Sequence, residues 1–156
     1  RAGLGDCETL RREGAPIPLR PLRRWDNGRD VLVTGDAAGV VAPASGEGIY
    51  YAMVSGRYAA DAVAAFLASG DPRALRQARR SFMRAHGLVF RILAMMQYFW
   101  YRNDRRRERF VAMCADRDVQ DLTWHAYRTK RLIFARPLAY ARIILKDVRH
   151  LIESAV

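Results

Sequence analysis

The chain has 156 residues, half of them hydrophobic, which is enough for one domain with a packed core and excludes wholesale disorder. Its formal net charge is +11, and the whole excess lies in the second half: residues 1–70 carry eight arginines and eight acidic side chains, whereas residues 71–156 carry 19 basic and eight acidic ones. Such a surface favours an anionic partner, which the charge alone leaves open as nucleic acid, acidic lipid headgroups or a polyanionic substrate.

Cysteine and histidine usage gives no sign of a metal site. Cys7 and Cys114 lie far apart and outside any CxxC pattern, which argues against a disulfide scaffold and a zinc site and suits a reducing compartment. The three histidines have no ligand spacing and are predicted to be surface or boundary residues: His86, His125 and His150. No apolar run reaches the roughly 20 residues of a membrane span. The chain begins at Arg1 without a signal-like stretch, so we expect it to be part of a longer protein.

The first thirty residues predict an extended segment and a turn. Closely spaced prolines in "GAPIPLRPLRRW" (14–25) exclude a helix, and "DNG" at Asp26 to Gly28 is typical of a turn. The β-branched run that follows, Val31 to Thr34, predicts a short buried strand.

After a glycine-rich loop, the pattern changes to helical periodicity. Apolar and small residues share one helical stripe at Ile49, Met53, Gly56, Ala60, Val63 and Leu67. Further small residues keep this helix thin, which predicts close approach to a sheet: Ser55, Ala59 and Ala64. Gly70 is the expected end of this helix. Asp71 is the expected cap of the next, with Pro72 in its first turn.

From Pro72 onward the pattern predicts helices only, over 72–101, 104–115, 117–134 and 137–153. The chain is therefore expected to be mainly α with a short β segment, in two parts. Residues 1–70 hold the strand, loop and first long helix, and residues 71–156 form a helical region.

The stretch from Thr34 to Ile49 is the candidate site. A strand, a Gly35–Asp36 pair, a glycine-rich loop and a helix start form a recurring way to hold a phosphorylated cofactor, since the helix start offers unpaired N–H donors. Taken on glycine spacing alone, an ordinary strand-to-helix turn capped by Asp36 is favoured. "GEGIYY" lacks the third glycine of the dinucleotide fingerprint and does not directly follow the strand.

The whole stretch from Gly35 to Ile49 is more informative than its glycine spacing alone. "GDAAG…P…SGEGI" with the following helix resembles the second flavin-contacting motif of the flavoprotein hydroxylase and geranylgeranyl reductase superfamily. "GDAAGVVAPASGEGIYYAM" is most similar to the geranylgeranyl reductases of bacteriochlorophyll and chlorophyll synthesis, of the purple-bacterial type. The likeness continues upstream in "REGAPIPLRPLRRWDNGRDV" and downstream in "FMRAHGLVFRILAMMQYFWY" and "PLAYARIILKDVRHL", so it spans nearly the whole chain.

The resemblance implies the carboxy-terminal portion of an α/β FAD-binding domain of Rossmann-like, glutathione-reductase type, followed by a helical tail. Asp36, after Gly35, matches the aspartate that binds the ribityl part of FAD, and Gly39 and Pro43 match the loop along the isoalloxazine. The helix start beneath the flavin's pyrimidine side is matched by Gly46, Glu47, Gly48 and Ile49. A helix N-terminus there stabilises the negative charge of a reduced flavin. The amino-terminal GxGxxG segment is absent, so the isolated piece is not expected to retain FAD.

The implied activity is the NADPH-dependent reduction of a geranylgeranyl group to phytyl. The substrate would be geranylgeranyl-bacteriochlorophyll(ide) or geranylgeranyl diphosphate. No catalytic residue is identified. Tyr50, Tyr51 and Glu47 lie near the flavin loop in sequence, without a sign that they face substrate. The expected location is the cytoplasmic side of the photosynthetic inner membrane, in peripheral contact with anionic lipid. Two alternatives are a flavin-dependent aromatic hydroxylase or monooxygenase and a basic nucleic-acid-binding module.

The helical half leaves two questions open. Residues 89–101, "VFRILAMMQYFWY", would line a prenyl tunnel or form an ordinary helix core. The arginine run at 105–109 is typical of a solvated face, with contact to a diphosphate or headgroups as the alternative. The last expected helix is amphipathic and basic, compatible with an anionic membrane surface or with packing on the flavin domain.

Overall fold

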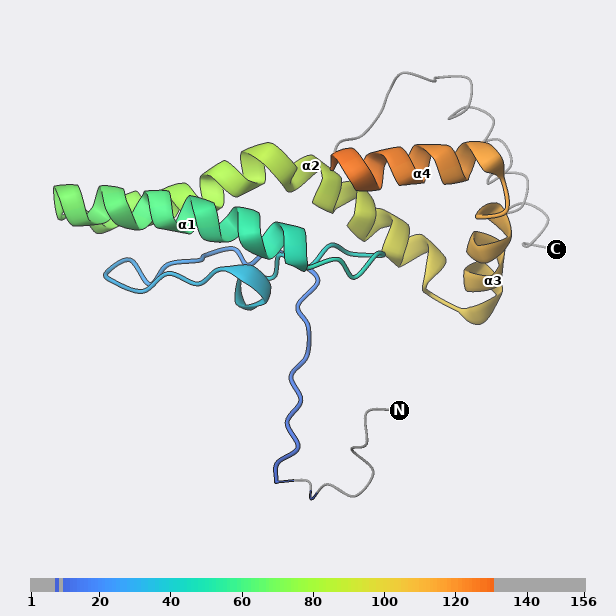
Figure 1. Ribbon diagram of the computed structural model, residues 1–156, viewed down its shortest axis with the longest axis horizontal. Helices are drawn as coiled ribbons and strands as arrows, with labels where there is room; N and C mark the ends of the chain where they lie inside the picture. The colour runs from blue at the N-terminus through green and yellow to red at the C-terminus, as the bar shows by residue number, and fades with distance from the viewer. Residues whose placement is uncertain (1–7, 9, 131–156) are drawn as a thin grey trace.

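The computed structural model describes residue 8 and residues 10–130, and within them the chain is mainly helical (Figure 1). Its elements, in order, are the 3-10 turn η2 (Gly35–Ala38), α1 (Ile49–Ser69), the 3-10 turn η3 (Pro72–Leu75), α2 (Arg76–Trp100), α3 (Asp104–Met113) and α4 (Arg117–Thr129). The predicted helices over 72–101 and 104–115, and the start of the next at 117, are confirmed to within a few residues. The end of that helix at 134 and the helix at 137–153 lie outside the described residues.

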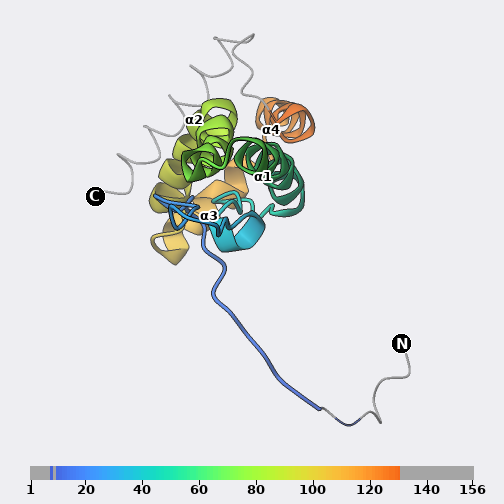
Figure 2. The same cartoon turned by 90° about the vertical axis from the view of Figure 1, so that its left-hand side faces the viewer.

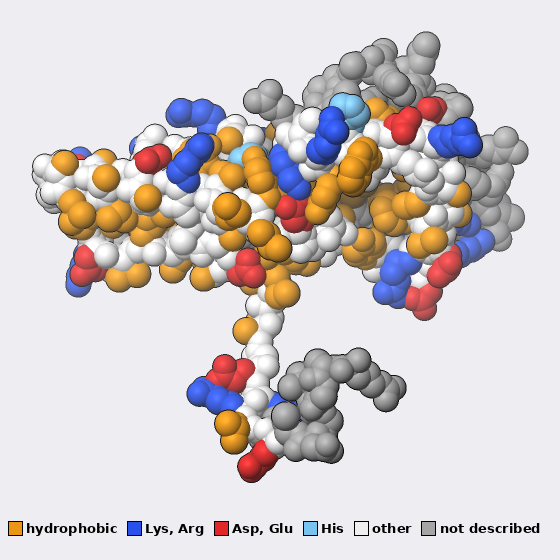
Figure 3. Space-filling view, viewed as in Figure 1, with side chains coloured by type: hydrophobic (Ala, Val, Ile, Leu, Met, Phe, Trp, Pro, Cys, Tyr) orange, Lys and Arg blue, Asp and Glu red, His pale blue; other side chains and the backbone are white. Residues whose placement is uncertain are grey.

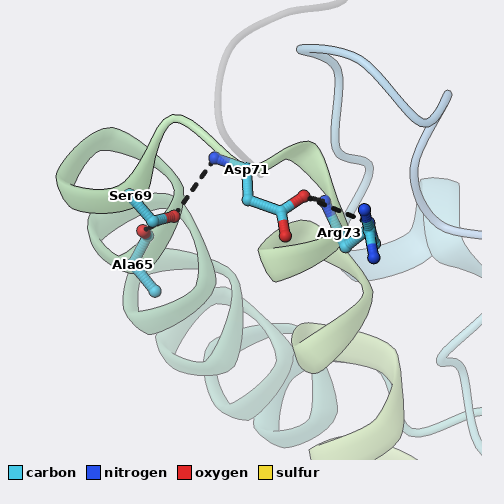
Figure 4. Close-up of polar contacts among 4 residues, drawn as sticks. All are labelled: Ala65, Ser69, Asp71 and Arg73. Carbon is cyan, nitrogen blue, oxygen red and sulfur yellow. Dashed lines mark hydrogen bonds and ion pairs between the residues drawn. The ribbon is translucent and has the colours of Figure 1, made fainter.

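The two longest helices form an antiparallel pair (Figure 1). Gly70 ends α1 in a left-handed conformation and donates its N–H to the Phe66 carbonyl, as predicted. The Asp71 carboxylate then accepts the Arg73 N–H at 2.9 Å, which confirms the predicted cap (Figure 4). Ser69 supports the same turn, since its hydroxyl donates to the Ala65 carbonyl and accepts the Asp71 N–H.

Residues 20–34 form a hairpin beneath α1, and the expected buried strand at Val31 to Thr34 is wrong. Among the described residues the hairpin contains a single antiparallel bridge, Asp26 to Leu32, and Val31 is 53% exposed. A buried strand needs a paired neighbour on each side, whereas this one pairs only with the segment just before the turn. The turn itself is confirmed, because the Asn27 side chain accepts the N–H groups of residues 29–31.

The core is an aromatic layer between the hairpin, α1 and α2. Trp25 and Phe82 lie 5.3 Å apart between ring centroids, and Tyr51 meets Phe90 edge to face at 4.9 Å. His86 packs into this layer and is only 8% exposed, so its expected surface or boundary position is wrong. Three aromatic rings pack against it, and burial follows because an uncharged imidazole packs like an aromatic ring: Tyr50, Tyr51 and Phe82.

The apolar stripe of α1 lies on the surface of the helix, and the close approach to a sheet that the small residues predicted is not seen among the described residues. Ile49 is 80% exposed, and Met53 and Leu67 are similarly open, so apolar side chains appear along this helix in Figure 3. The buried face carries Tyr51 and the small residues Ser55 and Ala62. Small residues do permit close approach, but the elements that approach them are η2 and α2.

Helices α3 and α4 extend the fold beyond this core. α3 crosses the end of α2, and α4 runs back so that its carboxyl end lies near the start of α1 in both views (Figures 1 and 2). Neither helix is deeply packed, since α3 buries no side chain and α4 buries only Leu122. Of the helices in the described part of the chain, none has the length and apolar character needed to cross a membrane.

Residues 89–101 are the last part of α2 and the residue that follows it, and the structure divides them between the interior and the surface. Phe90 belongs to the aromatic layer, whereas Met95, Tyr98 and Phe99 are exposed. An ordinary core therefore accounts for the first part of this segment, where Leu93 also packs against the aromatic layer.

Candidate functional site

The candidate site is the loop that joins η2 to α1. The loop closes on itself, because the Ala42 N–H donates to the Glu47 carbonyl at 2.8 Å and the Gly46 N–H donates to the Ala42 carbonyl at 3.0 Å. Gly46 has a φ of 69°, and a Cβ placed there would meet no atom within 4 Å. The backbone at the tip of the loop is therefore open to a flat ligand.

Ser55 of α1 fixes the other end of the loop. Its fully buried hydroxyl accepts hydrogen bonds from the Thr34 hydroxyl at 2.8 Å and from the Gly35 N–H at 3.1 Å, and donates to the Ala52 carbonyl. Sequence reasoning treated Ser55 only as a small residue. The signal that would have found it is a hydroxyl on a helix face otherwise occupied by Tyr51 and Ala62, because a buried hydroxyl requires partners.

Asp36 and Gly48 lie together at the start of α1. Asp36 is exposed, and a Cβ built on Gly48 would come within 3.1 Å of its Oδ1 atom. Gly48 is the N-cap of α1 and offers no side-chain cap to the free N–H groups of the first turn. The arrangement joins a hydrogen-bond-accepting carboxylate to a donor-rich, electropositive helix end.

Gly39 and Pro43 lie inside the loop rather than on its outer surface, and both are buried. Gly39 has a φ of 76°, and a Cβ there would come within 2.1 Å of the Arg20 carbonyl oxygen. Its missing side chain therefore makes room for the chain's own backbone. Ile49, by contrast, projects outward.

The helical half contacts the loop at two points that sequence reasoning missed. The Tyr101 hydroxyl, just after α2, donates to the Ala44 carbonyl at 2.6 Å. Lys130, which caps α4, forms an ion pair with Glu47 in which both side chains are largely buried, at 13% and 15% exposure. The Lys130 ammonium also lies over the rings of Tyr127, at 3.8 Å, and Tyr50, at 5.2 Å. The periodicity of residues within one helix cannot predict contacts between residues this far apart in the sequence.

Tyr51 lies beneath the loop and keeps its proton at neutral pH. Burial, followed by the nearby Glu47 charge and by Tyr50, raises the pKa of Tyr51 to about 12. Its side chain is almost fully buried, so it supports the aromatic layer rather than the open side of the loop. Across residues 10–130, no three His, Cys, Asp or Glu side chains come together as a metal site.

The chain belongs to the lycopene cyclase protein family, whose model matches residues 1–141. Its relatives include the geranylgeranyl diphosphate reductase of Rhodobacter capsulatus, 56% identical over 150 residues that cover 96% of this chain and 38% of the relative. The proteins of the same name from Synechocystis and, in the chloroplast, from Oryza sativa subsp. japonica are each 38% identical. They align over 94% and 93% of this chain and over 37% and 32% of their own lengths.

These relatives confirm the expected similarity to geranylgeranyl reductases, from purple bacteria to plants. The chain spans less than two-fifths of their length. No solved structure matches it.

Proposed function

We propose that this chain is part of an FAD-dependent geranylgeranyl reductase that uses NADPH to hydrogenate a geranylgeranyl group to phytyl. The substrate is geranylgeranyl-bacteriochlorophyll(ide) or geranylgeranyl diphosphate. The observation that carries the proposal is the 56% identity to the Rhodobacter capsulatus reductase across 96% of the chain. Neither an aromatic hydroxylase nor a nucleic-acid-binding module has a comparable relative in its favour.

The residues at the loop fit a flavin. The exposed Asp36 carboxylate is free to accept hydrogen bonds from ribityl hydroxyls, and the backbone around Gly46 has room for a flat ring. FAD would supply hydride transfer between NADPH and the alkene.

The chain's own contribution at this site is electrostatic and positional. The α1 N-terminus, beginning at Gly48, stabilises negative charge by about 0.3–1 kcal/mol, and by up to about 2 kcal/mol where partly buried. An unactivated alkene also requires a proton at its second carbon, so substrate positioning and proton supply carry much of the barrier lowering. The proton donor is not assigned to Tyr51, because that side chain is buried.

We also propose peripheral contact with the anionic face of the photosynthetic membrane, on its cytoplasmic side. Trp124 and Tyr127 are exposed on α4, and the Arg102 guanidinium lies 5.8 Å from the centre of the exposed Tyr98 ring. Exposed aromatic and basic side chains together suit a lipid headgroup region. The substrate's isoprenoid tail is itself a lipid-soluble group, which supports the same location.

The test uses the full-length protein, anaerobically, with NADPH and a geranylgeranylated pigment, and follows the mass of the pigment tail. Stepwise gains of two hydrogens are expected. NADPH consumption with no gain in mass would contradict the proposed substrate.

A variant tests the cofactor site separately. Asp36→Ala is expected to weaken FAD retention, because the carboxylate that accepts ribityl hydrogen bonds is removed. Asp61→Ala, at an exposed acidic residue of α1, is the matched control and should retain FAD. Full flavin occupancy in Asp36→Ala would contradict the assignment of Asp36.

A further inference from the structure

The Glu47–Lys130 ion pair joins the flavin loop to the carboxyl end of α4. The two residues are 83 positions apart, and α4 must run back along the molecule for Lys130 to reach the loop (Figure 1). The ammonium is enclosed by the Glu47 carboxylate and by the rings of Tyr50 and Tyr127. One ammonium therefore contacts three side chains from the loop, α1 and α4.

The position of Glu47 explains why a partner is needed. Its carbonyl accepts the Ala42 N–H that closes the loop, and its residue directly precedes Gly48, the N-cap of α1. A carboxylate that is only 15% exposed has lost most of its hydration, which is costly unless a cation compensates it. Unpaired, it would also place a negative charge beside the helix end that favours anions.

We infer that Lys130 is a positioning residue for the 42–48 loop: its ammonium neutralises Glu47 and holds the loop backbone in the shape that receives the flavin. This inference rests on the proposed function. Lys130 acts through Glu47 and does not itself touch the cofactor.

A second contact in the same place supports the inference independently. The Tyr101 hydroxyl holds the Ala44 carbonyl at 2.6 Å, and Ala44 has a left-handed φ of 65°. An alanine rarely adopts this conformation without surrounding contacts that hold it. The helical half thus fixes the loop at Ala44 and at Glu47, on either side of the open backbone at Gly46.

The test compares variants of the full-length protein, stripped of flavin and titrated with FAD. Lys130→Met is expected to raise the FAD dissociation constant by about tenfold, whereas Lys130→Arg should keep most of the affinity. Adding Glu47→Gln to Lys130→Met should restore binding, since no unpaired charge then remains. Arg128→Met removes an exposed charge two positions earlier and is the matched control, with no expected change.

Two results of the FAD titration would overturn the inference: wild-type affinity in Lys130→Met, or a double variant as weak as the single one. Amide hydrogen exchange of the flavin-free protein gives a readout independent of flavin. Exchange at Ala42 and Gly46, whose N–H groups close the loop, should accelerate in Lys130→Met and not in Arg128→Met. If the wild-type protein binds no FAD, the proposed function fails, and unchanged exchange at the loop would separately overturn the positioning role.

Discussion

The aromatic layer and the α3–α4 region are held together by different forces. Between the hairpin, α1 and α2, rings such as Trp25, Tyr51 and Phe82 pack with almost no exposure. In α3 and α4 the one buried side chain within the described residues is Leu122. Polar contacts connect that region to the rest, including Lys130 with Glu47 and Arg106 with the Phe99 carbonyl. The ring of Phe110 adds contacts with Trp100 and Tyr101 at the end of α2.

This difference indicates that the aromatic layer provides most of the stability, whereas the α3–α4 region controls the conformation of the loop. Burial of apolar rings contributes most of a fold's stabilisation, whereas ion pairs and single hydrogen bonds contribute less. Regions with few buried apolar contacts open at lower free energy than the core. The α3–α4 region is therefore expected to open before the aromatic layer, releasing the loop without unfolding α1.

The largest effect is expected at the centre of the aromatic layer. Phe82→Ala should lower the free energy of unfolding by about 3–5 kcal/mol, because Phe82 is fully buried and packs against Trp25, Tyr51 and Phe90. Urea denaturation of the full-length protein measures the loss. Phe99→Ala, at an exposed ring of the same helix, is the control and should cost far less. Equal losses would remove the distinction between the two faces of α2.

Gly39 offers a test of the packing between the loop and the hairpin. Gly39→Ala should cost about 2–5 kcal/mol, the sum of a clash with the Arg20 carbonyl and a left-handed alanine. Gly46→Ala is matched to it, since its φ is also positive but its Cβ would meet open space, so only the conformational cost of about 1–2 kcal/mol remains. Urea midpoints of the two variants should differ accordingly, and similar midpoints would contradict the tight packing at Gly39.

A smaller effect is expected at Leu122. Leu122→Ala should cost about 2 kcal/mol, the low end for a buried leucine, because its surroundings are sparsely packed. Hydrogen exchange should accelerate over α3 and α4 while protection around Phe82 stays unchanged. Acceleration in both regions at once would mean that they unfold as one unit.

The smallest effect concerns pH and the buried His86. Burial lowers the pKa of His86 below its ordinary value of 6.5, so the unfolded chain binds the proton more readily than the folded one. The stability that neutral His86 contributes is complete above pH 6.5 and is lost as the pH falls below it. Tyr50 and Tyr51 pack against the imidazole, and the raised pKa of Tyr51 keeps that side chain uncharged over this range.

The check is a pair of urea titrations, at pH 7.5 and 5.5, on wild type and His86→Phe. The variant should lose less stability between the two conditions than wild type does. An identical loss in both proteins would show that the folded state binds a proton at His86 as readily as the unfolded state does, which would contradict the lowered pKa.

Local chemistry made much of the fold predictable. The Asp71 cap, the Gly70 terminus and the turn at residues 26–28 follow from side chains that satisfy nearby backbone groups, and they appear as expected. The candidate loop could also be located, because Gly35, Asp36 and the "SGEG" stretch at 45–48 lie close together in the chain. The assigned flavin contacts remain predictions.

The remaining features of the fold and the site depend on which helix faces pack against each other. A single sequence does not contain this information. The apolar stripe of α1 through Met53 and Leu67 lies on the surface, because α2 covers the opposite face of the helix. The periodicity identifies a helix but not its partner. Lys130 and Tyr101 were missed for a related reason, because their partners in the loop lie 83 and 57 positions away.

The distance along the chain between Glu47 and Lys130 also sets an order of events during synthesis. A ribosome adds about 5–20 residues per second. Synthesis of the 83 positions from Glu47 to Lys130 therefore takes roughly 4–17 seconds, during which the loop lacks its lysine partner. Until then the Glu47 carboxylate is solvated and the loop samples other shapes. The loop is therefore clamped only after α4 has been synthesised, and a chain truncated before α4 would emerge with the 42–48 loop unclamped.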